Sequence, residues 1–253
     1  MDRAQAIDLD RERSVGEILG SALDLYRAYP LLFLTLAVVV MAPYDLVVLA
    51  ATGQGPLGQA HERFATALLV QILGFSLVGP LISALHVHAL VEIGKGSRPR
   101  LAAVAVSGLL VLPVVSAAEI VANIGIALGL LALILPGVLL ALRWAVVAQV
   151  AAVEHEGWIP ALRRSGALTA GCYWHILGLS VITGGLAFAI RRVLGAVALG
   201  SSSSSVMLGI ALDTILASFT ALTLAILYFD LRARESDPGR RRIPEYQHLH
   251  DLD

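Results

Sequence analysis

The chain is built from long apolar runs that are separated by short breaks carrying arginine. Its mean hydropathy is +0.80, and 57% of its residues are hydrophobic. A water-soluble domain presents a largely polar surface, and it has no place for so much apolar surface. The runs therefore predict an integral membrane protein, so the solvent for most of the chain is the bilayer rather than water.

The apolar runs are long enough for six transmembrane helices, each of which needs about 20 residues. The run from residue 101 to residue 153 has the length of two spans, and Leu135-Pro136-Gly137 is its best turn signal. The runs lack the alternation of barrel strands, and a helix bonds its backbone groups internally. The pattern therefore predicts an all-α polytopic membrane helix bundle. The predicted spans are residues 31–51, 66–93, two within 101–153, 173–190 and 206–229.

Basic residues are concentrated on one side of these predicted spans. Lys95 is the only lysine among the 18 basic residues, and Arg143 lies inside a span. Because basic residues collect in cytoplasmic loops, the richer side is predicted to be cytoplasmic, with both termini on it. The richer side holds Arg3, Arg11, Arg13, Arg27, Lys95, Arg98, Arg100, Arg163, Arg164, Arg232, Arg234, Arg240, Arg241 and Arg242, and the other side holds Arg63, Arg191 and Arg192.

Three segments have the pattern of amphipathic helices that lie on the cytoplasmic membrane surface. The first runs from a capping box at Ser14 to Pro30. A weaker second one begins at Pro99, and a third begins at Pro160, a residue favoured in the first helical turn. The alternative is that each segment extends the span that follows it. Together with the spans, the segments suggest three repeated units, each a surface helix and a membrane hairpin. These units would begin near Ser14, Ser97 and Trp158.

The charge pattern divides the chain into three parts. Residues 1–30 are predicted to form a cytoplasmic segment with the first surface helix, residues 31–230 the six-helix transmembrane domain, and residues 231–253 a flexible cytoplasmic tail. The formal net charge of -1 argues against nucleic acid as a partner. The single cysteine, Cys172, excludes an intramolecular disulfide, and no Cys/His pattern predicts a metal site or another cofactor site.

Polar residues at membrane depth are costly, and they are the first candidates for function. Glu119, Asn123 and Arg143 interrupt adjacent predicted spans and form the candidate intramembrane polar site. With a turn at Pro136 and about 1.5 Å of rise per residue, Asn123 is the nearer partner of Arg143. With a turn near Gly129, Glu119 comes level with Arg143 instead. A structural polar clamp is the main hypothesis, and a transport or catalytic role is the alternative.

Other polar residues carry weaker signals. Asp45 and Asp213 are expected near the external ends of their spans. His86 and His88 lie two positions apart, so they point in different directions and make a poor metal site. The candidate cytoplasmic contact surface consists of Arg163, Arg164, Arg232 and Arg234. In contrast, Gly125-x-x-x-Gly129 predicts only close helix packing.

Several motifs resemble the membrane domain associated with bacterial glycerophosphodiester phosphodiesterases. They are Pro136-Gly137, Arg143-Trp144, Glu156-Gly157, Ala161-Leu162-x-Arg164-Ser165-x-x-Leu168-Thr169-x-Gly171-x-Tyr173-Trp174 and Tyr228-Phe229-Asp230-Leu231-Arg232-x-Arg234. The resemblance implies a six-helix protein of the bacterial cytoplasmic membrane, similar to the stand-alone members of that family. The His-Arg and Glu-Asn motifs of the fused catalytic domain are not found in this sequence, so the resemblance does not carry over the enzymatic activity.

Three functions follow as hypotheses. The first is a non-enzymatic scaffold or anchor, in which the basic cytoplasmic surface contacts anionic lipid or a protein partner. The second is a transporter or lipid-handling protein with a polar site around Asn123 and Arg143. The third is an intramembrane enzyme, which needs a second carboxylate within reach of Glu119. A polar cavity in the bundle favours the second hypothesis, and closed apolar packing favours the first.

Overall fold

The structure is a computed structural model of the chain that describes residues 8–9, 11–52, 64–97, 99–197 and 203–236. All regular secondary structure in these residues is helical. Six segments are long and apolar enough to cross a membrane, which confirms the predicted all-α bundle of an integral membrane protein. They are Pro30–Ala51, Leu68–Gly94, Leu101–Ala132, Ile134–Glu154, Tyr173–Val193 and Val206–Ser236.

The first surface helix is a separate element, α1 (Val15–Ala28), which precedes the first span, α2 (Pro30–Thr52). The predicted capping box is confirmed, because the Ser14 hydroxyl accepts a hydrogen bond from the Glu17 N–H and the Glu17 carboxylate accepts one from the Ser14 N–H. One stripe of α1 is buried, and it consists of Ile18, Ala22 and Leu25. This stripe holds α1 against the bundle as an amphipathic helix.

The second span contains a wide turn where a proline interrupts the helix. It consists of α3 (Phe64–Leu73), a π-helical turn (Gly74–Val78) and α4 (Gly79–Gly94). Pro80 has no N–H, so the carbonyl four residues before it loses its usual helical donor. The helix widens at this point, and the N–H of Gly79 bonds to the carbonyl of Gly74. Such π-helical turns are frequent at functional sites.

The third and fourth spans form a hairpin that turns at Leu133. The third span is α5 (Leu101–Ala132), and the fourth consists of α6 (Ile134–Arg143) and α7 (Val147–Glu154). The prediction of a turn at Leu135-Pro136-Gly137 is wrong by a few residues. Leu133 has extended backbone, while Pro136 lies in the first turn of α6. Proline fits there because the first N–H groups of a helix have no internal acceptor.

Glycines allow α5 and α6 to pack closely, as Gly125-x-x-x-Gly129 predicted. A Cβ atom on Gly129 would lie 2.9 Å from the Cα atom of Gly137. A Cβ atom on Gly125 would lie 2.6 Å from the Trp144 ring. Only glycine leaves room for these contacts, so the two helices meet along the stripe of Gly137, Leu140 and Trp144.

The last part of the chain contains one surface helix and two spans: α8 (Trp158–Thr169), α9 (Tyr173–Val197) and α10 (Ser203–Ser236). The third surface helix is therefore separate, whereas the segment after Pro99 continues into α5 without a break. The predicted tail begins too early, because α10 is helical through Ser236 and ion pairs of Arg234 and Glu235 hold its end. Residues 237–253 lie outside the described part. The three repeated units stay a prediction.

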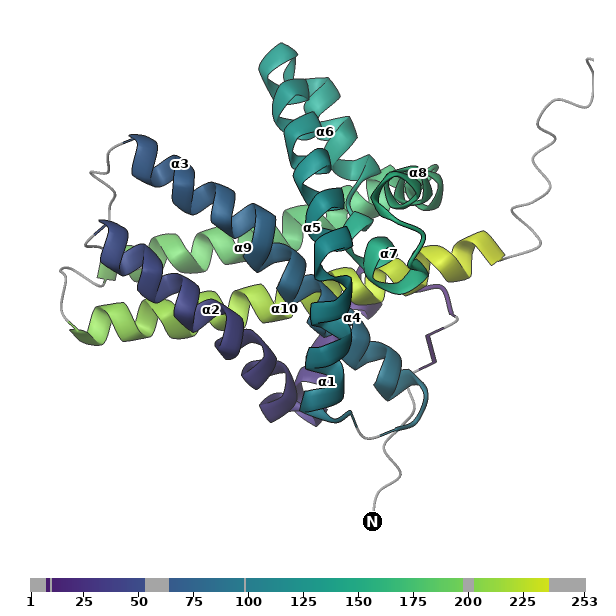
Figure 1. Cartoon of the computed structure of the whole chain (residues 1–253). Helices are drawn as coiled ribbons and strands as arrows, with labels where there is room; N and C mark the ends of the chain where they lie inside the picture. The colour runs from purple at the N-terminus through teal and green to yellow at the C-terminus, as the bar shows by residue number, and fades with distance from the viewer. Residues whose placement is uncertain (1–7, 10, 53–63, 98, 198–202, 237–253) are drawn as a thin grey trace, which may run out of the picture.

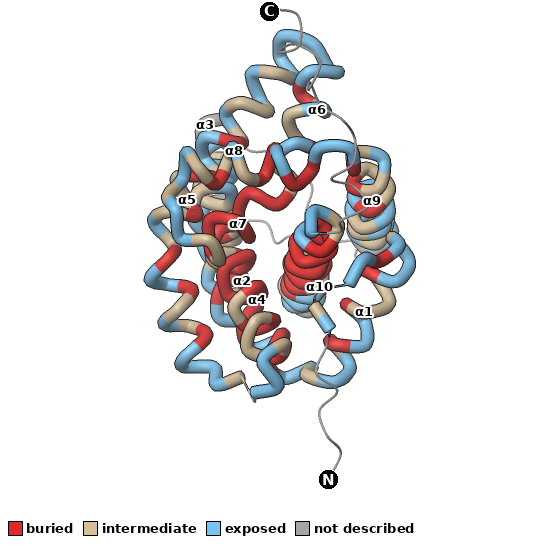
Figure 2. The backbone as a smooth tube through the Cα atoms, turned by 90° about the vertical axis from the view of Figure 1, so that its right-hand side faces the viewer, coloured by how far each residue is buried: buried red, intermediate tan, exposed pale blue. Residues whose placement is uncertain are grey.

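Helix α10 lies at the centre of the bundle (Figure 2). It contacts α1, α2, α4, α7, α8 and α9, and the side chains of Leu222, Ile226 and Tyr228 are fully buried. The tip of the α5–α6 hairpin projects from the rest of the bundle (Figure 1). The tip is apolar and exposed, with Leu131 84% exposed. Such a surface is expected to contact lipid.

A test of the hairpin is the substitution Gly137→Ala, with Gly185→Ala as its control. The new Cβ atom would lie 2.5 Å from the Leu130 backbone nitrogen, whereas a Cβ atom on Gly185 meets nothing within 4 Å. We expect Gly137→Ala to lower the free energy of unfolding in detergent by about 1–3 kcal/mol through overpacking. Gly185→Ala should leave it unchanged or raise it slightly, because alanine favours helix. Equal stabilities would contradict the packing of α5 on α6.

Candidate functional site

A polar cavity of about 230 Å³ lies where the second and fourth spans depart from regular helix. The π-helical turn of the second span contributes Phe75 to its wall. The break between α6 and α7 contributes Trp144 and Ala145. Irregular backbone at membrane depth is tolerated where it is buried in protein or lines a cavity. Both irregularities flank this one space, which marks it as the candidate site; we call it the Glu119 cavity.

Four polar side chains from three spans line the Glu119 cavity. Glu119 and Asn123 come from α5, Ser83 from α4 and Gln149 from α7. The remaining lining is apolar or aromatic and consists of Phe75, Ala122, Ile126, Trp144, Ala145, Val147, Ala148 and Leu224. The lining thus combines an apolar wall with a few convergent polar groups, which is typical of ligand sites.

The Gln149 amide is the most informative group in the cavity. The residue is only 1% exposed, and neither its Nε2 nor its Oε1 atom has a hydrogen-bond partner among the described residues. A buried amide without partners costs about 1–3 kcal/mol. Gln149 belongs to the lining of a space large enough for several water-sized groups, although its two amide atoms have almost no exposed surface of their own.

Arg143 does not belong to the candidate site, contrary to the prediction. The turn at Leu133 brings it level with Asn123, but consecutive helical residues point about 100° apart. Trp144 occupies the face toward α5, so Arg143 points toward α8, where a Cβ atom on Gly166 would lie 2.8 Å from its Nε atom. The structure has no ion pair between Arg143 and Glu119 within the described residues. The predicted polar clamp, in which Arg143 pairs with Glu119 or Asn123, is therefore absent from the described residues. In its place is a cavity whose lining contains the acid Glu119 and no basic residue.

The backbone carbonyl of Arg143, rather than its guanidinium, makes the structural contacts there. The hydroxyls of Ser165 and Thr169 on α8 both donate to this carbonyl, each at 3.1 Å. The carbonyl lies near the end of α6, where the last carbonyls of a helix lack internal donors. These two hydroxyls therefore fix the break that shapes the cavity wall.

The two histidines of α4 point in different directions, as their spacing predicted. The Nδ1 atom of His86 lies 2.9 Å from the Ile82 carbonyl, and its Nε2 atom lies 2.8 Å from the Ser218 hydroxyl on α10. His88 instead stacks on His155, with ring centroids 6.4 Å apart. His86 is thus a buried residue that bonds α4 to α10.

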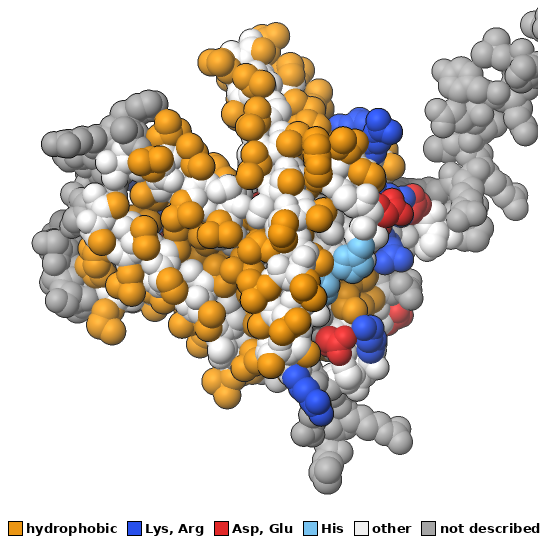
Figure 3. Space-filling model, viewed as in Figure 1, with side chains coloured by type: hydrophobic (Ala, Val, Ile, Leu, Met, Phe, Trp, Pro, Cys, Tyr) orange, Lys and Arg blue, Asp and Glu red, His pale blue; other side chains and the backbone are white. Residues whose placement is uncertain are grey.

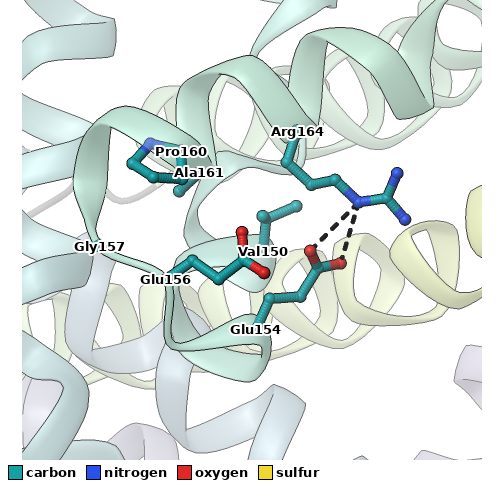
Figure 4. A pocket seen from close by; sticks show the side chains of 7 residues that line it. All are labelled: Val150, Glu154, Glu156, Gly157, Pro160, Ala161 and Arg164. Atoms are coloured by element: carbon teal, nitrogen blue, oxygen red, sulfur yellow. Dashed lines mark hydrogen bonds and ion pairs between the residues drawn. The ribbon is translucent and has the colours of Figure 1, made fainter.

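Arg164 holds three helices together at the charged end of the molecule, which we define by Arg13, Arg164, Asp230 and Arg234. Its Nε atom bonds to Glu154 on α7 at 3.1 Å (Figure 4), and its two terminal nitrogens each lie 2.6 Å from the Glu235 carboxylate on α10. Hydrogen bonds to Glu235 raise the pKa of Arg164 above its ordinary value.

The space beside this ion pair is a packing gap rather than a binding site. Val150, Glu156, Gly157, Pro160 and Ala161 line it with the Glu154–Arg164 pair (Figure 4), and it has no room for a water-sized group. Arg164 therefore has a structural role.

Asp230 forms a second ionic centre at the charged end, and it binds the N-terminal segment to α10. Its carboxylate is fully buried and accepts from the Arg13 N–H at 2.5 Å and from the Arg234 Nε at 2.8 Å. The Nε2 atom of His175 lies 3.3 Å away. Arg234 also donates to the Arg13 carbonyl at 2.5 Å. The N-terminal segment is thereby fixed to the end of the last span.

These contacts correct the predicted cytoplasmic contact surface. Arg164 pairs with carboxylates on α7 and α10. Arg234 pairs with Asp230 on its own helix and with Glu12 of the N-terminal segment. Arg163 is exposed, and Arg232 is exposed with its guanidinium 5.7 Å from the centre of the Tyr228 ring. Arg232 also lines an open cleft of about 480 Å³ with Arg164, Glu235 and Ser236. The surface available to partners is therefore smaller than predicted.

At the opposite end of the bundle, the two predicted aspartates differ in their surroundings. Asp213 on α10 pairs with Arg191 on α9 at 2.7 Å. Asp45 on α2 is 2% exposed, and its Oδ2 atom has no hydrogen-bond partner among the described residues. The Arg191–Asp213 ion pair therefore joins α9 to α10 at this end of the bundle.

Only two of the four polar residues that line the cavity were predicted from the sequence. Glu119 and Asn123 were predicted because they are conspicuous in an apolar run. Gln149 stands in the same run, and its amide was the signal that could have found it. Ser83 and Trp144 give no such signal, because serine and tryptophan are common in membrane helices. The Asp230 centre has only the four-residue spacing of Asp230 and Arg234 as a signal.

Comparisons with protein-family models, curated proteins and solved structures give no match for this chain. The resemblance to the membrane domain of the phosphodiesterases therefore stays a prediction.

A test of the Asp230 centre is the substitution Asp230→Ala. It leaves the Arg13 N–H and the Arg234 Nε–H without their acceptor, and breaking a buried pair in this way costs about 3–5 kcal/mol. We expect a lower free energy of unfolding and rapid tryptic cleavage after Arg13, which is 2% exposed in the intact fold.

The control for this test is Glu12→Gln. Glu12 is about half exposed and contacts Arg234 only at 3.6 Å, so its loss should change stability by less than about 1 kcal/mol. If Asp230→Ala leaves Arg13 protected from trypsin, the N-terminal segment is held by something other than Asp230.

Proposed function

We propose that this multi-pass membrane protein binds the polar part of a small molecule or lipid in the Glu119 cavity, as a lipid-handling protein or transporter does. The observation that carries the proposal is the unpartnered amide of Gln149, which is buried at the wall of a cavity between two irregular helices. Binding sites of membrane transporters are commonly built at interrupted helices. A bound polar group would form the hydrogen bonds that no described protein group forms with the Gln149 amide.

The position of the cavity favours entry from the lipid side of the bundle. Its wall includes Phe75, which is 49% exposed, and the half-buried Asn123 and Ile126. The molecular surface is hollowed between α3 and the α5–α6 hairpin, and hydrophobic side chains surround this hollow (Figure 3). A lipid whose acyl chains lie along this face would have its polar part beside the cavity.

The charged end supports the scaffold hypothesis as a second candidate. Arg163 and Arg232 are exposed there. Trp158 on α8 and Trp174 on α9 are also exposed. Arginine with exposed tryptophan is typical of a membrane–water interface, where arginine attracts anionic lipid. In this proposal the charged end faces the cytoplasm of a bacterial cell, and its contacts orient the protein without providing the main function.

The enzyme hypothesis receives less support from the geometry. It requires two carboxylates within reach of each other. Glu119 is the only carboxylate among the residues that line the cavity. The cavity therefore has the groups for binding a polar molecule, but it lacks the acid–base pair for hydrolysis.

The test is the substitution Gln149→Leu, with Gln71→Leu as a matched control. Both changes replace an amide by an apolar side chain of similar size, but Gln71 lies exposed on α3 outside the cavity. We expect Gln149→Leu to abolish the retention of lipid or small molecules that native mass spectrometry detects on the protein extracted from its membrane. Gln71→Leu should retain them.

Stability gives a second measurement for the same pair of variants. Removal of an unpartnered amide should raise the free energy of unfolding of the delipidated protein by about 1–3 kcal/mol for Gln149→Leu. If both variants retain the same bound molecules as the unmodified chain, the cavity is not a binding site.

A further inference from the structure

We infer that the ligand of the Glu119 cavity carries a primary ammonium group, which pairs with the Glu119 carboxylate. This inference rests on the proposed function and adds the chemical class of the ligand. It follows from the charge of the cavity, its acceptors and its aromatic walls.

The charge of the lining favours a cation over an anion. Glu119 is the only ionisable residue in the lining, which contains no lysine, arginine or histidine. Arg143, the base expected beside it, points to Gly166 on the other side of α6. A phosphate or carboxylate in the cavity would meet the Glu119 carboxylate without a counter-charge, at a high cost in a medium of low dielectric constant. An ammonium ion would neutralise it.

The acceptors in the cavity match the three N–H donors of a primary ammonium group. Three residues with acceptor atoms, Glu119, Gln149 and Ser83, belong to the lining and come from three different helices. The Gln149 Oε1 atom has no protein donor among the described residues. The amide N–H groups of Gln149 and Asn123 remain as donors for an oxygen atom of the ligand next to the amine.

The aromatic walls and the size of the cavity agree with this class. Trp144 and Phe75 line the cavity with its polar residues, and an aromatic face stabilises a cation within about 6 Å of its centre. The volume of about 230 Å³ is smaller than the roughly 300–1,000 Å³ of sites for drug-sized ligands. It suits a head group of a few heavy atoms. Two sources have this chemistry: the head group of an aminophospholipid and a free amine from water.

The experiment compares lipid nanodiscs that differ only in head group. The full-length protein is reconstituted into equimolar mixtures of phosphatidylethanolamine and phosphatidylglycerol with the same acyl chains, and native mass spectrometry counts the lipids that stay bound. We expect phosphatidylethanolamine to be retained about tenfold or more over phosphatidylglycerol, as for a buried ion pair. Glu119→Gln should remove this preference, and Glu119→Asp should keep part of it.

The control is Glu92→Gln, which removes an acid of α4 that pairs with Lys95 outside the cavity. It should leave the preference unchanged. Thermal unfolding and size-exclusion chromatography establish that each variant is folded. If Glu119→Gln does not fold, the comparison of the two lipids on Glu119→Asp and on the unmodified chain still decides the question.

A separate arm distinguishes the two sources of the amine. Ethanolamine is titrated into the protein in nanodiscs of phosphatidylglycerol alone, and the thermal shift is measured with and without Glu119→Gln. A saturable, Glu119-dependent shift without retention of phosphatidylethanolamine identifies a free amine as the ligand. Retention of phosphatidylethanolamine without such a shift identifies the lipid.

Two results would overturn the inference, and they are distinguishable. If both lipids are retained equally, Glu119→Gln has no effect and Gln149→Leu releases both, the cavity binds a polar group that is not an amine, and the proposed function stands. If no lipid is retained, no amine shifts the unfolding temperature and Gln149→Leu does not change the molecules bound to the protein, the inference and the proposed function fail together.

Discussion

A polar side chain in a bilayer has no water to bond, so its free energy depends on the partners that the protein supplies. In this protein, that constraint determines how the spans are joined. His86 meets Ser218 between α4 and α10, Arg191 meets Asp213 between α9 and α10, and Asp230 joins α10 to the N-terminal segment. Each of these contacts involves α10, which explains why this helix lies at the centre of the bundle.

The Glu119 cavity departs from the same constraint. Gln149 is buried as deeply as His86 and Asp230, yet its amide meets no protein partner in the described residues. Two local features keep the space open. Pro80 forces the π-helical turn that contains Phe75, and Gly125 leaves room for the Trp144 ring at the break that Ser165 and Thr169 hold in place. Two irregular helices thus line a cavity that contains an acid, two amides and two aromatic rings. This is the arrangement expected of a binding site for a small polar cation.

The sequence determined the membrane class and the six spans because hydrophobic length is a local property. The close packing at Gly125 and Gly129 was also predictable, since small residues at this spacing allow helices to approach. The direction of Arg143 was not, because it depends on a turn that formed at Leu133 rather than at Pro136 and on which residue of α6 occupies the α5 face. The roles of Arg164 and of Asp230 toward Arg13 depend on partners far apart in the sequence. Only the Asp230–Arg234 pair has a signal in the sequence, which is its four-residue spacing. The three-unit repeat and the resemblance to the phosphodiesterase membrane domain stay predictions.

A high-resolution cryo-electron microscopy map of the protein in nanodiscs that contain the lipids of its own membrane would show directly whether the Glu119 cavity holds a ligand. We expect non-protein density in the Glu119 cavity, within hydrogen-bond distance of both the Gln149 amide and the Glu119 carboxylate. A map in which the cavity is closed by apolar side chains, or in which the Gln149 amide bonds to a protein group instead, would contradict this expectation.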